Sequence, residues 1–340
     1  MKSLKYILFP LLILIIGISI YVAVQPNSFD VTRERIIEAP ATVIYNNVID
    51  LKNWEAWSPW LEKNPESKLT YSEPTTGVDA SFLWEDDEGT GNIKTKSTSP
   101  NNTIEQDMQF EDYNPSNMNW SFTETPDGQT KVTWQLKADH IPFMFKIYSV
   151  FSGGFDNIFG PDFELGLEKL DSVVVADMKK YNITIKGVTQ HSGGFYIYNT
   201  ASSKINDVET KIKESLPKVI NYVRANSITT AGPPFINYLK WDTENNAAIF
   251  TCCVPTNSQV ITTDENFLTG QIESFRAVKV ILKGNRSNLK EAWEKAEAYI
   301  NKNGLEASEN GPNLETYVTD YMNFPNPADW VTEIYIAIKE

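Results

Sequence analysis

Two short stretches near the C-terminus each combine a carboxylate with a tyrosine, and these residue types could bind a cation. They contain Glu315 with Tyr317 and Glu333 with Tyr335. Residues 331–338 alternate in polarity, which predicts a strand with Glu333 and Tyr335 on one face. A buried carboxylate is costly unless it is paired or serves a cation. The pattern indicates a ligand site, and it leaves open an edge strand whose Glu333 face is simply in water.

The remaining candidates for chemistry are few. The two histidines, His140 and His191, lie far apart in the sequence and fit loop or surface positions better than a catalytic base. Cys252 and Cys253 are adjacent, so in a strand they point to opposite faces and no disulfide between them is expected. No Cys/His cluster has zinc spacing, and no nucleophile–base pair stands out. We therefore expect no metal and no cofactor.

Charge and size limit the function classes. The chain has 340 residues, which favours two domains, with a formal net charge of −14 and a pI near 4.8. Nucleic-acid binding needs a basic footprint, and the sequence has none. The negative charge also disfavours electrostatic docking on anionic lipid, whereas it permits cationic ligands. We expect a small-molecule partner and no nucleic-acid partner.

The N-terminus predicts a membrane anchor over residues 1–25. Residues 6–24 carry no charge, and their length is about that of a bilayer core. A cleaved signal peptide is the alternative, but its apolar core would be shorter and the sequence lacks a good cleavage site. Lys2 and Lys5 precede the span and place the rest of the chain on the extracytoplasmic side, although Arg33 and Arg35 weaken this orientation.

The pattern of residues 29–180, which follow the apolar span, predicts one mixed domain. A strand ends at Pro40, a helical piece follows, and about 70 residues then alternate with period two, as in an antiparallel meander. Residues 141–160 are predicted to form a loop rich in Phe and Gly. A long helix is predicted to open at Pro161.

This order resembles the START-like superfamily (SRPBCC), also called the polyketide cyclase/dehydrase and lipid-transport family. The resemblance rests on "RIIEAPATVIYNNVIDLKNWEAWSPW" and "PDFELGLEKLDSVV". It implies a helix-grip fold, in which an antiparallel sheet wraps around the last helix and leaves an apolar cavity. Six tryptophans of this region could line that cavity or could fill the core: Trp54, Trp57, Trp60, Trp84, Trp120 and Trp134.

Residues 182–340 contain an internal duplication of a strand–helix–strand–strand unit. "GPPFINY" is answered by "GPNLETY", so that Gly232, Pro233 and Tyr238 recur as Gly311, Pro312 and Tyr317. Two such copies would pair into one sheet with both helices on one face and a groove at the pseudo-twofold axis. The predicted fold class of the whole chain is α+β.

The duplicated region resembles the gyrase-inhibitory-protein-like (GyrI-like) family, also known as the bacterial transcription activator effector-binding domain. The residues that carry the resemblance are "LKEAWEKAEAYINKNGLE", "GPNLETY" and "WVTEIYIAI". It implies a groove for small, often cationic and aromatic molecules, with Glu333 as countercharge. The duplication places Glu315 one strand away from Glu333, in a supporting role. The aromatic residues implied to stack on the ligand are Tyr317, Tyr335, Trp330 and Tyr238.

The first repeat has Thr251 where the second has Glu333, so one carboxylate is expected at the axis. The family's transcription factors carry a DNA-binding helix-turn-helix, which this chain replaces by an apolar span and a START-like region. Direct gene regulation is therefore not expected.

Three functions remain from the sequence. The leading hypothesis is a membrane-anchored, non-catalytic binding protein for small hydrophobic or cationic molecules, with no residue assigned as catalytic. The second is a hydrolase of strained electrophilic molecules, in which Glu333 acts as base and Tyr317 as acid. The third is a non-binding interaction module whose grooves are filled by its own side chains.

Overall fold

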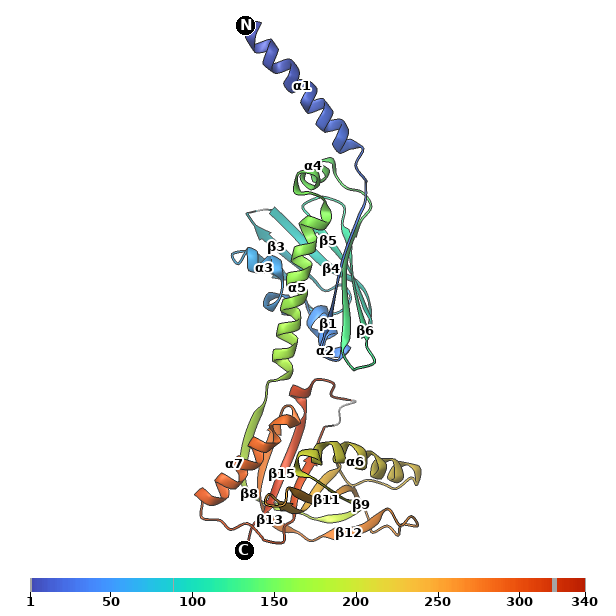
Figure 1. The fold of residues 1–340 in the computed structure, drawn as a ribbon, viewed down its shortest axis with the longest axis vertical. Helices are drawn as coiled ribbons and strands as arrows, with labels where there is room; N and C mark the ends of the chain where they lie inside the picture. Colours follow the sequence, from blue (N-terminus) through green and yellow to red (C-terminus); the bar gives the residue numbers. More distant parts are fainter. Residues whose placement is uncertain (1, 88, 320–322, 340) are drawn as a thin grey trace. The chain divides into compact units, whose positions relative to one another are not determined.

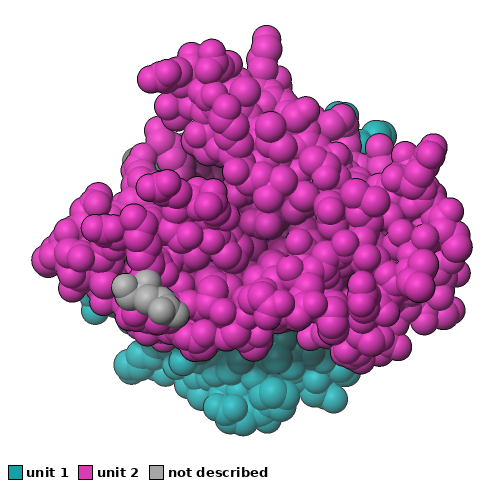
Figure 2. Space-filling model, turned by 90° about the horizontal axis from the view of Figure 1, so that it is seen from below, with its two compact units in different colours: residues 1–177 teal, residues 178–340 magenta. Residues whose placement is uncertain are grey.

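The computed structural model describes residues 2–87, 89–319 and 323–339 and divides the chain into two compact units (Figure 1). The first comprises residues 1–177 and the second residues 178–340, and Figure 2 colours them separately on the molecular surface. Each unit has an antiparallel sheet of its own, so the α+β class is confirmed.

The first unit begins with α1 (Lys2–Ala23), which contains Pro10. Its Tyr6–Ala23 segment is long and apolar enough to cross a membrane, a property that a signal sequence near an N-terminus shares. The predicted apolar helix is therefore present. Its topology and the side on which the rest of the chain lies stay predictions.

Seven antiparallel strands form the sheet of the first unit, in the order β1-β7-β6-β5-β4-β3-β2. Their bounds are β1 (Phe29–Ile37), β2 (Lys68–Tyr71), β3 (Ser81–Asp86), β4 (Gly89–Ser99), β5 (Thr103–Phe110), β6 (Ser116–Glu124) and β7 (Thr130–Ala138). The helical elements are α2 (Ala41–Ile49), η1 (Leu51–Ala56), α3 (Pro59–Lys63), α4 (Phe143–Ser152) and α5 (Phe155–Met178).

Aromatic side chains fill the space between this sheet and α5. The rings of Trp120 and Trp134 stack with their centroids 4.3 Å apart, and Trp134 stacks equally closely on Phe163 of α5. Trp54 and Trp57 are fully buried beside them. Gly166 lets α5 approach, because a Cβ there would meet Trp134 at 2.7 Å. These tryptophans therefore build a core in the place where the START-like resemblance implied a cavity.

A hollow of about 280 Å³ lies instead on the opposite face of the sheet. It is lined mostly by polar side chains: Thr103, Ile104, Glu105, Asn119, Trp120, Ser121, Thr133 and Gln135. This polar hollow is thus not the apolar cavity that was expected in the N-terminal region.

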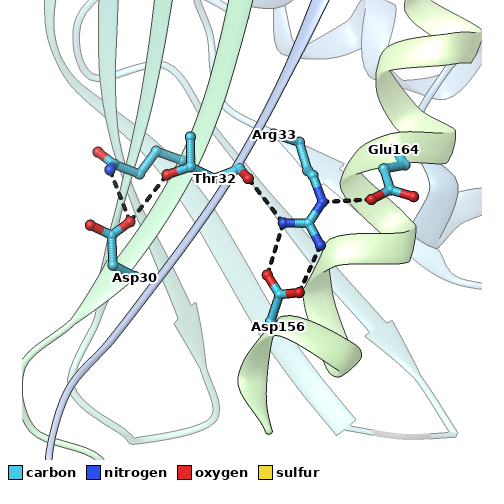
Figure 3. A network of polar contacts seen from close by, with 6 residues as sticks. Asp30, Thr32, Arg33, Asp156 and Glu164 are labelled. Carbon is cyan, nitrogen blue, oxygen red and sulfur yellow. Dashed lines mark hydrogen bonds and ion pairs between the residues drawn. The ribbon is translucent and has the colours of Figure 1, made fainter.

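Arg33 fastens β1 to α5 through two carboxylates (Figure 3). Its guanidinium donates two hydrogen bonds to Asp156, at 2.8 and 2.9 Å, and one from Nε to Glu164 at 2.6 Å. The planar fork of arginine matches a carboxylate in this bidentate way. The first strand of the sheet is thereby held to the last helix of the unit.

Two predictions for residues 141–178 were wrong in detail. The Phe/Gly-rich stretch contains a helix, α4, which ends where Gly153 adopts a left-handed conformation with φ of 82°. The helix α5 begins at Phe155, so Pro161 lies inside it rather than at its start. The buried residues of Phe143–Ser152 are the polar Lys146 and Ser149, so the segment lacks the apolar stripe that usually marks a helix packed on a core.

The second unit contains an eight-stranded antiparallel sheet in the order β12-β9-β11-β10-β14-β15-β13-β8. The strands are β8 (Asn182–His191), β9 (Gly194–Ser203), β10 (Phe235–Asp242), β11 (Ala247–Thr256), β12 (Leu268–Ile272), β13 (Phe275–Lys283), β14 (Asn313–Tyr317) and β15 (Val331–Ala337). The helices are η2 (Ile205–Asp207), α6 (Val208–Ala225), η3 (Arg286–Asn288), α7 (Leu289–Lys302) and η4 (Pro327–Asp329).

The sheet order reflects the duplication. Strands β9, β11 and β10 mirror β13, β15 and β14, and the two copies meet where β10 pairs with β14. Ile236 lies directly opposite Glu315, and these residues occupy equivalent positions in "GPPFINY" and "GPNLETY". The pseudo-twofold axis therefore passes through this pair. Strand β15 is internal, so Glu333 does not lie on an edge strand.

Both long helices cover one face of the sheet, which we call the helix face. Helix α6 packs in a cluster with Ile236 and Phe250, and α7 packs with Val280 and Ile334. Ile236, Glu315 and Ile334 are direct cross-strand neighbours and so share a face. We call the opposite side the far face.

Candidate functional site

The structure places Glu333 and Tyr317, which the sequence analysis combined in one site, on opposite faces of the sheet. Tyr317 pairs with Thr332 across the strands, so its side chain lies on the helix face. Glu333, the neighbour of Thr332, points to the far face because side chains alternate along a strand. Glu333 and Tyr317 therefore cannot act as base and acid on one substrate, which corrects the hydrolase assignment.

The helix face carries a buried carboxylate, Glu315, at the pseudo-twofold axis. It accepts hydrogen bonds from the Tyr317 hydroxyl at 2.7 Å and from the Tyr238 hydroxyl at 3.2 Å. The indole Nε1 of Trp293, on α7, donates a third at 3.2 Å. Glu315 is only 2% exposed. We call these four residues the Glu315 cluster.

The duplication explains the position of the two tyrosines. Tyr238 and Tyr317 occupy equivalent places in the two repeats, and Glu315 sits between them on the axis. The first repeat has Ile236 at the position equivalent to Glu315, so a single carboxylate receives both hydroxyls.

The Glu315 cluster has unusual electrostatics. Burial raises the pKa of Glu315, although its three donors act in the opposite direction. Burial and the nearby Glu315 raise the pKa of both tyrosines well above the usual value. The tyrosines thus stay protonated and act as donors. Among residues 2–87, 89–319 and 323–339, no Lys, Arg or His forms an ion pair with Glu315.

A cation lies beside this cluster without pairing with the carboxylate. The guanidinium carbon of Arg286, in η3, is 4.0 Å from the ring centroid of Tyr317 and 5.2 Å from that of Trp330. Its Nη2 donates to the Thr319 carbonyl at 3.2 Å, whereas its buried Nε has no partner in the described part of the chain. Burial lowers the pKa of Arg286, with Tyr317 and Glu315 opposing. The aromatic faces can thus hold a cation.

The far face carries the other predicted pair. The Glu333 carboxylate accepts a hydrogen bond from the Tyr335 hydroxyl at 2.6 Å and forms an ion pair with Lys279 at 2.9 Å. The Lys279 ammonium also lies 5.1 Å from the Tyr335 ring centroid. His191 stands edge-on to that ring, and burial, with Lys279 nearby, lowers its pKa. The charge of Glu333 is therefore already balanced.

Sequence reasoning placed Glu315 in a supporting role and did not single out Trp293 or Arg286 for the site. The signal for Glu315 was its place between the repeated tyrosines, at a position where the other repeat has an isoleucine. Trp293 belongs to the apolar stripe of α7, which reads as ordinary core. Nothing in the sequence marks Arg286, since it lies in a short 3-10 turn.

The described residues contain no group of three or more His, Cys, Asp and Glu side chains that could hold a metal ion. The side chains of the Glu315 cluster instead suit hydrogen bonding and the recognition of a positive charge.

Comparisons with known proteins concern the second unit. Residues 194–339 match the family described as GyrI-like small molecule binding domain, and the match begins at the first residue of β9. No curated protein matches the chain. The EcmrR C-terminal domain is 19% identical with a TM-score of 0.41, and the alignment covers 47% of this chain and 98% of that one.

Two further solved structures have similar values. SAV2435 bound to tetraphenylphosphonium is 9% identical, with a TM-score of 0.36 and coverage of 47% of this chain and 94% of that one. EcmrR in an EcmrR–DNA complex is 17% identical, with a TM-score of 0.41 and coverage of 58% and 70%. The absence of a nucleic-acid partner stays a prediction. Residues 194–339, less than half of the chain, are thus similar to the family of GyrI-like small-molecule-binding domains.

Proposed function

We propose that the second unit binds a small cationic molecule with aromatic or apolar groups at the Glu315 cluster. The observation that carries this proposal is the buried carboxylate itself, whose three partners are uncharged donors. A charge in a poorly solvated place attracts an opposite charge much more strongly than one in water. A cation is the ligand that would use this interaction fully.

The neighbouring aromatic rings support the same ligand class. Arg286 already places a positive group over Tyr317 and Trp330, at distances typical of cation–π contacts. Each such contact contributes roughly 0.5–2 kcal/mol. A ligand cation would take the place of the guanidinium over these rings.

The cluster is enclosed by protein, because Glu315 and Tyr317 are both buried. A ligand reaches the carboxylate only when covering side chains move. Arg286 is the first candidate, since its contacts among the described residues are a hydrogen bond to the Thr319 carbonyl and stacking on the rings of Tyr317 and Trp330. Binding would thus begin with exchange of one cation for another.

We propose no catalysis. For the rest of the chain we propose that residues 1–25 form a membrane anchor, that residues 29–180 form a START-like unit and that residues 182–340 form the binding unit. The packing of α5 on one face of a seven-stranded sheet supports the START-like assignment. Because tryptophans fill that interior, we assign it no ligand.

The test is calorimetric titration of residues 26–340 with tetraphenylphosphonium, an aromatic cation, and with a neutral aromatic compound of similar size. Glu315→Gln keeps the shape of the side chain and removes its charge, so we expect the Kd of the cation to rise at least about thirtyfold, or 2 kcal/mol. Glu333→Gln is the matched control and should change the Kd less than about twofold.

Circular dichroism of both variants checks that the fold is retained. Loss of binding in Glu333→Gln with retention in Glu315→Gln would move the site to the far face. Failure of a broad panel of cations to bind the unaltered protein would end the proposal.

A further inference from the structure

Helix α4 (Phe143–Ser152) presents large apolar side chains to solvent. Phe151 is 72% exposed and Met144 is 65% exposed, and Phe143 and Tyr148 are exposed as well. Met144, Tyr148 and Phe151 follow one another at helical spacing and so share a face. The buried residues of the same helix are Lys146 and Ser149, which point into the protein. The apolar face that α4 exposes thus runs along the helix from Met144 to Phe151.

The charge of this segment differs from that of the rest of the chain. Residues 141–155 contain one charged residue, Lys146, and no acidic residue, within a chain of net charge −14. Lys146 is only 9% exposed, and its ammonium donates to a backbone carbonyl. The outward surface of α4 therefore lacks the acidic side chains that keep the remaining surface in water.

The position of α4 relative to α1 is fixed by hydrogen bonds. Lys146 Nζ donates to the Gln25 carbonyl at 3.0 Å, and the Ile141 amide donates to the Asn27 carbonyl at 3.3 Å. Both acceptors follow closely on Ala23, the last residue of α1. Helices α1 and α4 also contact each other directly (Figure 1). Helix α4 hence lies at the level where the chain leaves α1.

The connection between α1 and β1 is short, so α4 stays close to the end of α1. Strand β1 starts at Phe29, so only residues 24–28 intervene. Five residues span at most about 17 Å when fully extended. If α1 crosses a bilayer, the surface of that bilayer lies next to α4.

We propose that α4 lies on the membrane as an interfacial helix, with Phe143, Met144, Tyr148 and Phe151 inserted among the lipids beside the end of α1. This inference rests on the membrane-anchor part of the proposed function and not on ligand binding. The partner is the bilayer interface itself, where aromatic side chains gather and the apolar face of a helix is removed from water. The contact is apolar rather than electrostatic, so it does not require anionic lipid.

The consequence is a fixed orientation of the first unit relative to the membrane. A single spanning helix followed by a linker would let a domain swing, whereas two contact points, α1 and α4, restrain it.

The experiment uses the full chain in phosphatidylcholine vesicles with a nitroxide label at one position at a time. The positions are Phe151→Cys and Tyr148→Cys on α4, Ile13→Cys within α1, and Ile36→Cys as the matched control. Ile36 is an exposed apolar residue near the other end of β1, roughly 25 Å from its start. Cys252 and Cys253 are buried, and the unsubstituted chain shows whether they take up label.

Collision with oxygen, which concentrates in lipid, is compared with collision with a water-soluble nickel chelate. We expect the labels at 13, 148 and 151 to favour oxygen and the label at 36 to favour nickel by at least about tenfold in ratio. Labels at 148 and 151 that behave as the label at 36, with 13 in lipid, would overturn the inference while leaving the anchor. An aqueous label at 13 would overturn both, and neither outcome bears on cation binding at Glu315.

Discussion

The two faces of the C-terminal sheet carry the same three kinds of side chain in different surroundings. On each face a carboxylate accepts a hydrogen bond from the hydroxyl of the tyrosine two residues later. A cation lies over the ring of that tyrosine. The sets are Glu315, Tyr317 and Arg286 on the helix face, and Glu333, Tyr335 and Lys279 on the far face.

The faces differ in where the cation's hydrogen bonds go. Lys279 forms an ion pair with Glu333, whose side chain is 21% exposed, so the charge is balanced within the protein. Arg286 donates to the Thr319 carbonyl and leaves Glu315 to uncharged donors. A glutamate and a tyrosine on one strand thus do not identify a cation site. The proposed cation site is distinguished by burial and by the lack of a paired countercharge among the described residues.

The largest effect expected from the comparison is on stability. Tyr317→Phe removes a hydrogen bond to a buried carboxylate and should lower the free energy of unfolding of the second unit by about 1.5–3 kcal/mol. Tyr335→Phe removes the equivalent bond at a half-buried, ion-paired carboxylate and should cost about 0.5–1 kcal/mol. Urea unfolding followed by hydrogen exchange within residues 178–340 measures both. Equal costs would mean that burial of Glu315 adds nothing to this bond.

A smaller effect is expected when the cations are exchanged for apolar side chains. Arg286→Met removes the group that competes with a ligand cation, so the affinity for tetraphenylphosphonium should rise about tenfold, or 1.4 kcal/mol. Lys279→Met removes an equal charge from the other face of the same sheet and should leave the affinity within about twofold. Isothermal titration of residues 26–340 decides. Weaker binding in Arg286→Met would show that the guanidinium helps to hold the ligand.

The sequence predicted the frame of the second unit better than its site. The alternation of residues 331–338 predicts β15, and the repeat of "GPPFINY" as "GPNLETY" predicts the pairing of two equivalent halves. Alternation states that Glu333 and Tyr335 share a face, but it cannot state which face the helices cover. That assignment needs the register between β14 and β15, and there Glu315 lies opposite Ile334 in the core under α7.

The elements that sequence reasoning missed have similar physical causes. In helix α4 the buried residues are the polar Lys146 and Ser149, so it lacks the apolar stripe that marks a helix packed on a core. Arg286 lies over Tyr317 only because the turn before α7 meets the end of β14 in space. Such contacts depend on tertiary packing and leave no local pattern.

The smallest effect is a pH dependence that the helix face should show through Glu315. The pKa of Glu315 is raised above its ordinary value of 4.5, so the carboxyl ionises over a range that begins there and extends upward. Since a cation binds the ionised form, its affinity should increase as the pH rises through this range. Folding responds oppositely, because a raised pKa stabilises the folded state below 4.5 and this contribution is lost as the pH rises.

Glu315→Gln should remove the contribution of Glu315 from both pH profiles. Titrations and urea unfolding at a series of pH values provide the measurements. A pH-independent affinity in the unaltered protein would show that Glu315 does not supply the charge.

The pairing of Ile236 with Glu315 on the axis has one further consequence. In a duplication that had kept both halves identical, two carboxyl groups would stand side by side, and neighbouring acids of this kind share one proton. Isoleucine in one half prevents this, so the pseudo-twofold framework holds a single carboxylate at its axis. An unsymmetrical ligand bound at the proposed site would therefore have one preferred orientation, whereas two identical halves would offer it two equal ones.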